Sequence, residues 1–387
     1  MNTKIRIAII GAGAIAKAHI SAFLQQEERC EITAVCDIFI DKAKQLIDSF
    51  NLQATAFSSL EETLNGADID AISICLPPDV HCSLSIMALN AGKHVLCEKP
   101  MATSVEECDK MIEAAKRNNK LLAIVCQLRY KTPMQKIKKL IQDEVAGKVL
   151  FANVQSLWWR GTNYHDIWWR GTWDKENGGV MMSHAVHHLD LLQWMIGMPD
   201  KITAITANVG HNNSETEDVG IVILQYPDKI AQLTASMVSH GEEQSLTFQC
   251  EKGRLNIPWD PACNKALENG FPTANEEELA RLKAAYDSLP TTKVTDHAGQ
   301  VINFLNAIEG KEELLIDGNQ GRNTIMLVIA TYAASVTGHT ISLPLTKDSP
   351  FYSKASMNAQ MPRFNKKYRN IDNFKTSDIT FSRDVDK

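Results

Sequence analysis

The chain has 387 residues, a formal net charge of −6 and 22% charged residues. This length predicts two domains, and the acidic balance argues against a nucleic-acid partner, which would need a basic face. No apolar run approaches the ~20 residues that a membrane-spanning helix requires, so we expect no membrane association. The nine cysteines show no Cys-x-x-Cys spacing, and no signal peptide is visible, so we expect reduced thiols and a cytoplasmic location.

Apolar strands alternate with amphipathic helices through the first part of the chain. The strands are expected at Ile5–Ile10, Ile32–Cys36, Ala71–Cys75, His94–Cys97 and Leu121–Cys126. This alternation is typical of an α/β fold with a doubly wound parallel sheet, the Rossmann arrangement. We therefore expect a dinucleotide-binding domain over residues 1–130.

The pattern changes after residue 130, where longer β-rich segments follow one another at hairpin spacing. They lie at residues 150–159, 202–209, 219–226, 230–237, 246–250 and 254–257. Helices are expected at residues 183–196, 298–308 and 321–337. We therefore expect an α+β domain with a mostly antiparallel open sheet over residues 131–346, for substrate binding and oligomerisation. Residues 347–387 would form a C-terminal arm, either over the surface or onto a partner subunit, or a loosely ordered tail.

The turn after the first strand has the pattern glycine-x-glycine-x-x-alanine. Gly11 permits a tight turn, Gly13 lets the backbone approach a pyrophosphate, and the small Ala16 allows close packing of helix on strand. The helix that starts here presents free amides, including those of Ala14 and Ile15, to an anion. The turn therefore predicts a dinucleotide site.

Asp37 ends the second strand, 21 residues beyond Ala16, close to the ~20 expected for the acidic residue of such a site. A carboxylate there accepts hydrogen bonds from the ribose hydroxyls and repels a 2′-phosphate. The cofactor is therefore expected to be NAD rather than NADP. The alternative is that Asp37 is only a turn or helix-capping residue.

The triplet Glu98-Lys99-Pro100 follows the apolar run His94–Cys97, which reads as a buried strand. Burial and a nearby nicotinamide would both disfavour the charged form of Lys99 and lower its pKa. Together with the glycine turn, this triplet resembles the Gfo/Idh/MocA family of oxidoreductases. The resemblance extends to about residue 345.

The resemblance implies catalytic roles for Lys99 and His187. The segment 176–190 is similar to the family's glycine stretch and the helix that bears a catalytic histidine, and its glycines would clear space for substrate and for the helix start. Ser183 stands where many members carry an aspartate, and His184 replaces a glutamine found in sugar dehydrogenases of the family. The division of labour between Lys99 and His187 therefore stays open.

The family's other contacts fall on residues near these motifs. On the cofactor side they are Leu76, Pro77, His81, Glu98 and Lys99, with a packing or capping role as the alternative for His81. Five of the seven tryptophans lie between residues 158 and 173, and flat rings can stack on sugars. On the substrate side the contacts would be Arg170, Trp173, Ser183, His184 and His187. The alternative for some of the rings is packing in the core. Histidines of segment 176–190 have spacings seen in zinc sites, but the metalloprotease pattern is absent and we expect no metal.

The function implied is an NAD(H)-dependent oxidoreductase acting on a secondary hydroxyl of a sugar, an inositol or a sugar derivative. Hydride would pass to the nicotinamide while Lys99 and His187 handle the hydroxyl proton. Two alternatives stay open: a redox-assisted glycosidase or lyase with tightly bound NAD, and a non-catalytic regulator that senses NAD. Relatives also imply a homodimer or homotetramer.

Overall fold

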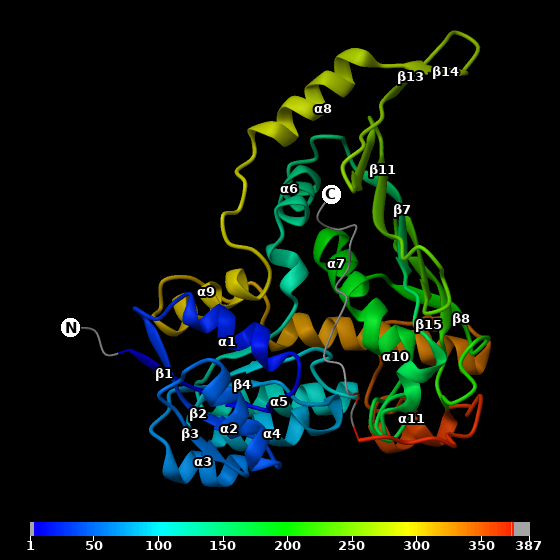
Figure 1. Ribbon diagram of the computed structural model, residues 1–387. Helices are drawn as coiled ribbons and strands as arrows, with labels where there is room; N and C mark the ends of the chain where they lie inside the picture. Colours follow the sequence, from blue (N-terminus) through cyan, green and yellow to red (C-terminus); the bar gives the residue numbers. More distant parts are fainter. Residues whose placement is uncertain (1–3, 373, 375–387) are drawn as a thin grey trace. The chain divides into compact units, whose positions relative to one another are not determined.

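The computed structural model describes residues 4–372 and 374. The chain forms two compact units, one from Met1–Gln127 with Val294–Ile325 and the other from Leu128–Lys293 with Met326–Lys387. The sequence analysis had placed residues 294–325 in the second domain. In the structure, helix α9 (Asp296–Ile308) of this segment packs beside α1 (Ala16–Leu24) in the first unit (Figure 1).

The first unit is built on a six-stranded parallel sheet with the strand order β3-β2-β1-β4-β5-β6. This confirms the expected doubly wound α/β arrangement, because the order reverses beside β1. The strands are β1 (Ile5–Ile10), β2 (Cys30–Cys36), β3 (Thr55–Phe57), β4 (Ala71–Ile74), β5 (His94–Cys97) and β6 (Leu122–Ile124). Nearly continuous apolar runs form these strands because both faces of a parallel sheet are covered.

Helices connect the parallel strands, and local signals set their ends. The connecting helices are α1, α2 (Ile40–Ser49), α3 (Leu60–Gly66), α4 (His81–Asn90) preceded by the short η1 (Pro78–Val80), and α5 (Val105–Arg117). Ser104 caps α5, because its Oγ accepts the N–H of Glu107 at 3.2 Å. Gly92 follows α4 at φ +75°, as expected for a residue after a helix end.

The returning segment completes the core of the first unit. Val301, Phe304 and Leu305 of α9 belong to the same buried cluster as Ile7 and Ile9 of β1. The Gln300 side chain also donates to Ile124 O at 2.6 Å and accepts the N–H of Cys126 at 3.0 Å. These bonds satisfy backbone groups at the end of β6, so the sheet of the first unit depends on a segment far away in the sequence.

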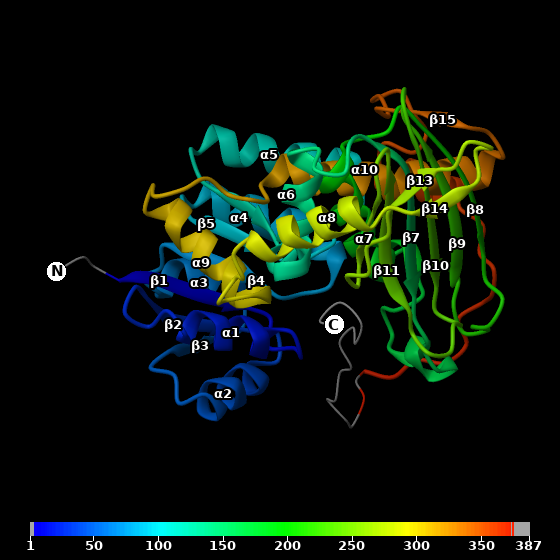
Figure 2. The same cartoon turned by 90° about the horizontal axis from the view of Figure 1, so that it is seen from above.

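The second unit contains a seven-stranded sheet with the order β12-β11-β7-β10-β9-β8-β15 (Figure 2). All neighbouring strands are antiparallel except β7 and β10, which are parallel. The strands are β7 (Val149–Leu157), β8 (Lys201–Ala207), β9 (Val219–Gln225), β10 (Ile230–Ser236), β11 (Gln244–Cys250), β12 (Arg254–Ile257) and β15 (Ile341–Ser342). The expected mostly antiparallel open sheet is confirmed.

Several helices accompany this sheet. They are the short η2 (Gln127–Tyr130), α6 (Thr132–Gln142), the short η3 (Thr162–Asp166), the π-helical turn η4 (Met181–Ala185), α7 (Val186–Ile196), α10 (Gly318–Thr337) and α11 (Lys354–Gln360). The expected helix at 183–196 is therefore a π-helical turn followed by an α-helix. The boundary between the two units falls inside α10. No helix among the described residues is long and apolar enough to cross a membrane.

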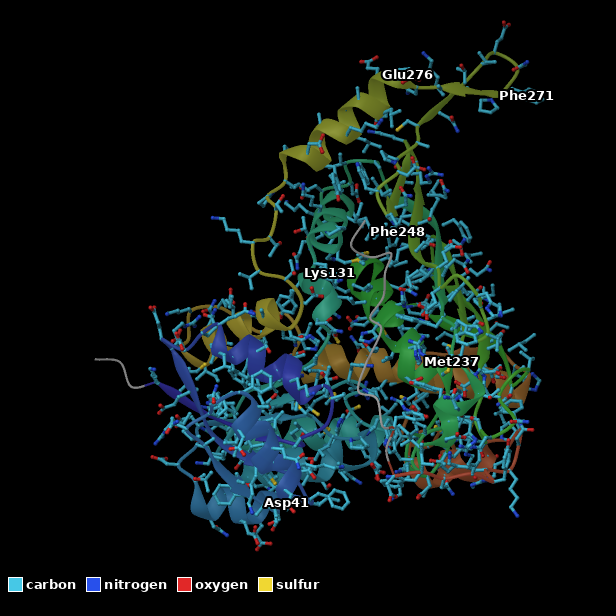
Figure 3. All side chains as sticks on the ribbon, in the orientation of Figure 1. Asp41, Lys131, Met237, Phe248, Phe271 and Glu276 are labelled. Atoms are coloured by element: carbon cyan, nitrogen blue, oxygen red, sulfur yellow. The ribbon has the colours of Figure 1, made fainter. Side chains whose placement is uncertain are left out.

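The chain continues after β12 into a hairpin and a helix, and the sequence analysis predicted neither of them. The hairpin pairs β13 (Asn264–Ala266) with β14 (Pro272–Ala274), and α8 (Glu276–Ser288) follows it. Figure 3 shows Phe271 in the hairpin turn and Glu276 at the start of α8. The signal for α8 was present in the sequence, because Asn275 caps it by accepting the N–H of Glu278 at 3.2 Å.

The C-terminal segment packs on the second unit as far as residue 372. Pro362 O accepts the indole N–H of Trp173 at 3.0 Å, and the Phe364 N–H donates to Glu215 O at 3.0 Å. Ile371 forms a bridge with Ile167. The rest of the expected arm, residues 373 and 375–387, lies outside the described residues.

Candidate functional site

The glycine turn after β1 has the backbone geometry that its sequence predicted. Gly11 adopts φ +103°, and a Cβ at this position would lie 2.5 Å from Cys75 O. Its N–H donates to Cys36 O at 2.7 Å, which ties the turn to the end of β2. Any side chain at Gly11 would therefore strain the turn and collide with the backbone after β4.

Gly13 and the start of α1 leave an open cradle. No described atom lies within 4 Å of the place where a Cβ of Gly13 would be, and Gly13 and Ala14 are exposed. Ile15 packs partly against the core. Within the described residues, no side chain caps α1 and no acidic residue occupies its first turn. The positive end of the helix is therefore available to an anionic group, so these residues fit a pyrophosphate.

Asp37 lies at the end of β2 and faces the glycine turn. Its Oδ2 accepts the N–H of Ala12 at 2.8 Å, and its Oδ1 accepts the N–H of Phe39 at 2.9 Å. These two bonds fix the carboxylate beside the turn. The next two side chains, Ile38 and Phe39, are 80% and 58% exposed, which the sequence analysis did not single out. Apolar residues directly after an acidic strand end were the available signal.

The loop after β4 brings Leu76 and Pro77 to the same end of the sheet, and both are half-buried. His81 is fully buried, with Nδ1 2.8 Å from Pro100 O and Nε2 2.8 Å from Leu76 O. Burial lowers the pKa of His81, although the two carbonyl groups oppose the shift. This burial agrees with the packing role that the sequence analysis left open as the alternative, and contact of His81 with the cofactor stays a prediction. Its ring joins two loops and is enclosed by them.

Glu98 and Lys99 follow the last residue of β5. Glu98 is buried, and its Oε1 lies 2.9 Å from Nε2 of His19. Its Oε2 accepts the N–H of Lys99 at 3.1 Å. Lys99 itself is half-buried. The lysine therefore stands at the carboxyl end of a parallel strand, where doubly wound folds bind their ligands, and a buried carboxylate holds its backbone.

The glycines before the histidine helix lie in crowded surroundings. Gly178 adopts φ +149°, and its Cβ would collide with the Tyr332 hydroxyl. A Cβ on Gly179 would collide with Glu217 O. The sequence analysis expected these glycines to clear space for substrate and for the helix start. Tyr332 and Glu217 fill the space next to them, and Glu217 meets the helix start, so the second half of the expectation agrees with the structure and the first does not.

Glu217 is a buried neighbour of the histidine helix that the sequence analysis missed. Its carboxylate is buried. Oε2 accepts the N–H of Gly179 at 3.0 Å, and Oε1 accepts the N–H of Met181 at 3.0 Å and the hydroxyl of Tyr332 at 2.9 Å. It thereby caps the start of η4 from outside the helix. Burial raises the pKa of Glu217 to about 7, although its hydrogen bonds act against the shift. An acidic residue just before β9 was the only sequence signal.

The side chains of the histidine helix occupy different surroundings. Ser183 Oγ donates to Gly179 O at 2.7 Å and lies 2.8 Å from Nδ1 of His184. His184 is buried against Trp158 and Tyr164, with ring centroids 5.2 and 5.9 Å away. His187 is half-buried on α7.

Metal ligation by these histidines finds no geometric support. Among the described residues, the group of histidine and acidic side chains whose ligand atoms converge is His19, Glu98 and His297, which belongs to the first unit. His188 is fully buried, neither of its ring nitrogens has a hydrogen-bond partner among the described residues, and burial lowers its pKa to about 4.

Arg170 and Trp173 were both expected to contact substrate, but they differ in burial and in their neighbours. The Arg170 guanidinium lies over the rings of Tyr164 and Trp169, 4.2 and 4.4 Å from their centroids, and pairs with Glu176 at 3.2 Å. Trp173 is fully buried, and its ring meets Tyr332 edge-on at 5.2 Å. This ring packs in the interior of the second unit, as the sequence analysis left open for some of the tryptophans, and contact of Trp173 with substrate stays a prediction.

Comparisons with known proteins match both units. A family model described as an oxidoreductase family with an NAD-binding Rossmann fold matches residues 5–125, and a GFO/IDH/MocA C-terminal domain model matches residues 134–256. The solved structure of the WlbA dehydrogenase from Chromobacterium violaceum, in complex with NADH and UDP-GlcNAcA, is 31% identical with a TM-score of 0.77. That match covers 89% of this chain and 98% of that one.

Curated relatives are similar over comparable lengths. D-glucoside 3-dehydrogenase of Escherichia coli is 26% identical over 367 residues, which cover 88% of this chain and 98% of that protein. Inositol 2-dehydrogenase/D-chiro-inositol 3-dehydrogenase of Lactiplantibacillus plantarum is 25% identical over 293 residues, which cover 73% and 80% of the two chains. The similarity thus spans the glycine turn, the Glu98-Lys99-Pro100 triplet and the histidine helix.

Proposed function

Because the chain belongs to the Gfo/Idh/MocA family of NAD-binding oxidoreductases, we propose that it is a dehydrogenase for a secondary hydroxyl of a sugar, an inositol or a sugar derivative. The observation that carries the proposal is Lys99, half-buried at the end of β5 in the unit that offers the open helix start at Gly13. The names of relatives, a glucoside dehydrogenase and an inositol dehydrogenase, support this substrate class.

The first unit would hold NAD through groups that the structure already fixes. The exposed turn at Gly13, Ala14 and Ile15 would take the pyrophosphate, since the start of α1 offers free amides. Asp37 would accept the ribose hydroxyls, and its negative charge would disfavour a 2′-phosphate. Bound NAD supplies the hydride acceptor.

We assign the hydroxyl proton to Lys99, with His187 as the second proton-handling group. A positioned amine or imidazole accepts this proton while the carbon loses hydride, so charge does not build up on the oxygen. Arg170, Ser183 and His184 present polar groups from the second unit and would orient neighbouring hydroxyls. Trp173 has no part in this assignment because it is buried.

The central experiment tests turnover with the Lys99→Ala variant. A panel of D-glucosides and inositols is offered with NAD, and NADH formation is followed by absorbance. Lys99→Ala should lower turnover by ~10²–10⁴ while the dissociation constant for NADH stays within a few fold, since the lysine acts on the hydroxyl proton. If Lys99→Ala instead loses stability but keeps normal turnover, Lys99 is a structural partner of Glu98.

The same panel separates the two alternative functions. Product formation without accumulation of NADH, with NAD retained through gel filtration, would favour a redox-assisted glycosidase or lyase. Tight NADH binding with no chemical change in any sugar would favour an NAD-sensing regulator. Lys99→Ala would then leave the binding response intact.

We propose that the outer face of the second unit's sheet is covered by a second copy of the chain, giving a homodimer or homotetramer. Ile205 of β8, Ile221 of β9 and Ile230 of β10 are 72%, 46% and 50% exposed, and Ile205 pairs directly with Ile221 across the strands. Contiguous exposed apolar side chains mark protein interfaces. Light scattering should give a multiple of the monomer mass, and Ile205→Lys with Ile221→Lys should reduce it to the monomer.

We also propose a cytoplasmic location. All nine cysteines are free thiols in the structure, and all except Cys250 are buried. Buried apolar surroundings raise the pKa of several of these thiols, Cys30 to about 11 and Cys82 to about 12, which makes them unreactive packing groups. Thiol titration of the native and the unfolded protein should find most thiols only after unfolding.

A further inference from the structure

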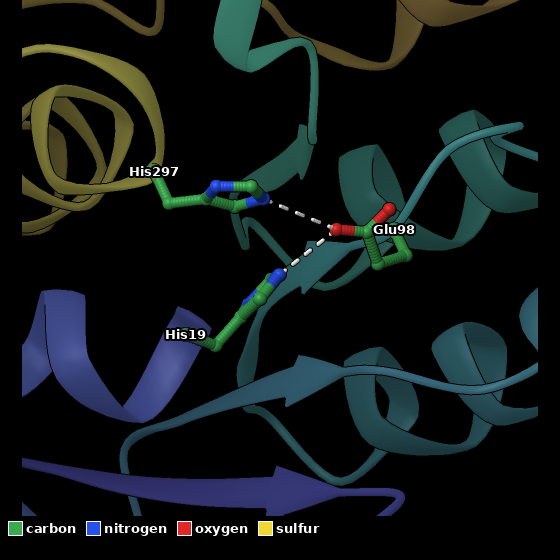
Figure 4. A group of neighbouring side chains, drawn as sticks. All are labelled: His19, Glu98 and His297. Carbon is green, nitrogen blue, oxygen red and sulfur yellow. Dashed lines mark hydrogen bonds and ion pairs between the residues drawn. The ribbon is translucent and has the colours of Figure 1, made fainter. Parts of the chain in front are cut away.

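Three side chains of the first unit meet around the carboxylate of Glu98 (Figure 4). They come from distant parts of the sequence: His19 from α1, Glu98 from the turn after β5, and His297 from the first turn of α9. Nε2 of His19 lies 2.9 Å and Nε2 of His297 lies 3.7 Å from the same oxygen, Oε1. The other oxygen accepts the N–H of Lys99 at 3.1 Å.

Glu98 remains a carboxylate in this buried position. Its side chain is only 7% exposed, and burial alone raises a carboxyl pKa. The contacts that His19 and His297 make with this carboxylate outweigh burial and hold the pKa of Glu98 well below its ordinary value. Without these imidazoles, the charge of Glu98 would be costly to bury.

The His19 ring is fixed from both sides. Its Nδ1 lies 2.7 Å from Ser73 Oγ, and its Nε2 lies 2.9 Å from Glu98 Oε1, so both nitrogens have a hydrogen-bonding neighbour. His297 is held differently, because its Nε2 approaches Glu98 only within ion-pair range. Its side chain is 14% exposed, which makes it the least enclosed of the three groups.

The same three groups have ligand atoms within 4.8 Å of one another, so a metal ion must be weighed. Zinc bonds of ~2.0–2.1 Å in tetrahedral geometry separate two ligand atoms by about 3.3 Å. The 2.9 Å between His19 and Glu98 is shorter than this and matches an ordinary hydrogen bond. The geometry therefore favours a hydrogen-bonded chain, Ser73–His19–Glu98, with His297 at its open side.

We propose that His19 and His297 are positioning residues for Lys99. They keep Glu98 charged and stationary, and Glu98 in turn holds the backbone of Lys99 through Oε2. This proposal rests on the proposed catalytic role of Lys99. Since His297 belongs to the segment 294–325, the return of the chain to the first unit would serve chemistry as well as packing.

Three of the other ionisable groups that face Glu98 keep their neutral form near neutral pH. Burial, with a smaller contribution from Glu98, raises the pKa of the Cys75 and Cys97 thiols, and burial lowers the pKa of His81. The pH dependence of turnover follows the proton on Lys99, so it is a suitable readout for the removal of His297. The groups facing this carboxylate are His19, Cys75, His81, Cys97, Lys99 and His297.

The test compares His297→Leu and His297→Gln with the parent enzyme, using NAD and the best substrate of the sugar and inositol panel. His297→Leu should lower kcat about tenfold and leave KM for NAD within about twofold, because misplaced catalytic groups slow chemistry more than binding. The acid limb of the kcat profile should move to higher pH, since an uncompensated carboxylate favours the protonated form of a neighbouring amine. His297→Gln, which keeps an N–H donor, should recover most of kcat.

His94→Leu is the matched control. His94 is a half-buried histidine at the opposite end of β5, where its Nδ1 accepts the N–H of Leu121 at 3.1 Å. It should lower the melting temperature while leaving kcat and the pH profile unchanged. A similar melting temperature for His94→Leu and His297→Leu would exclude stability as the cause of the rate loss.

Three outcomes would overturn the proposal, and they are distinguishable. Unchanged kcat and pH profile in His297→Leu, with Lys99→Ala inactive, would refute the positioning role alone. Normal turnover in Lys99→Ala would refute the proposed function itself. Stoichiometric zinc that survives dialysis and is lost in His297→Leu would replace the hydrogen-bonded chain with a metal site. If His297→Leu does not fold, the pH profile of His297→Gln carries the test.

Discussion

Two glycine turns of this molecule each precede a helix, but their surroundings are opposite. After β1, the Cβ position of Gly13 meets no described atom within 4 Å, and the start of α1 has no side-chain cap among the described residues. Before η4 and α7, the Cβ positions of Gly178 and Gly179 collide with Tyr332 and Glu217. One turn is open to a ligand, and the other is filled by the protein.

The difference shows two physical reasons for the same sequence pattern. Glycine admits close approach of another group, which would be an external anion under the proposed function in one case and is a buried internal carboxyl group in the other. Glu217 gives the second helix start the negative partner that a pyrophosphate would give the first. A glycine pattern therefore indicates close approach, and only the surrounding structure tells what approaches.

The largest expected effect is that of Gly179→Ala. Because the added methyl group would collide with the Glu217 backbone, the variant should lose ~4 kcal/mol or more of stability, in the range where backbone and core must rearrange. Thermal unfolding measures this loss. Gly197→Ala, where the Cβ meets no described atom but φ is +86°, is the control for backbone strain alone and should cost less.

Gly13→Val should have a smaller effect, and on ligand binding rather than on stability. The side chain would occupy the open cradle at the start of α1, so NADH affinity should fall about ten- to a hundredfold, or ~1–3 kcal/mol. Fluorescence titration gives the affinity, and the melting temperature without cofactor should stay within a few degrees. A large loss of stability with normal NADH binding would mean that the two turns do not differ as described.

Glu217 should make the stability of the fold depend on pH, and the Glu217→Gln variant provides the comparison. Its pKa is about 7 in the folded chain and 4.5 ordinarily, so folding is favoured while the carboxyl is protonated. This contribution, up to a few kcal/mol, is fully present below about pH 4.5, falls as pH rises and is absent above about pH 7. The loss of melting temperature between about pH 5 and about pH 8 should be smaller in Glu217→Gln.

The comparison with Glu217→Gln is needed because other buried groups oppose this trend. Burial lowers the pKa of His188 to about 4, so that residue destabilises the fold as pH falls. This histidine is common to both proteins and cancels from the difference. Parallel melting curves for the two proteins across the whole pH range would contradict the assignment to Glu217.

The smallest expected effect is on the choice between NADH and NADPH, and it tests the role of Asp37 beside the open turn. Asp37→Ser removes the charge that would face a 2′-phosphate, so the preference for NADH over NADPH should fall by roughly tenfold or more, ~1–2 kcal/mol. Fluorescence titration with both cofactors measures the ratio. Because Asp37 also accepts the Ala12 N–H, some loss of NADH affinity should accompany the change. Tighter binding of NADPH by the parent protein would refute the role of Asp37.

Local patterns in the sequence were sufficient for five strands of the first sheet, the glycine turn and the strand end at Lys99, but not for the short β3 (Thr55–Phe57). Each depends on neighbours in sequence: an apolar run, a glycine at a turn, a capping residue such as Ser104. The return of α9 to the first unit was not visible, because it depends on Gln300 reaching backbone groups of β6 across the sequence. The family resemblance carried the expected roles of Lys99 and His187, which remain predictions.

Several residues that suit a ligand site are enclosed in the structure for one reason. His81, Trp173 and the glycines before η4 have residue types that suit a ligand site, but partners distant in the sequence enclose them. Glu217 was missed for the same reason, since nothing in its local sequence shows that it lies beneath a helix start. Burial by distant segments depends on the fold. It cannot be predicted from local patterns in a single sequence.

The divided first unit also affects how the chain is made. During synthesis, Met1–Gln127 emerges first, but its core lacks Val301, Phe304 and Leu305 until the ribosome has passed the whole of Leu128–Lys293. The second unit's strands β7 to β12 are therefore available to pair before the first unit can close. A fragment ending near residue 130 would expose the apolar surface that α9 covers, and we expect it to aggregate. We therefore expect the nucleotide-binding unit to complete its folding late, although the larger part of its residues is translated first.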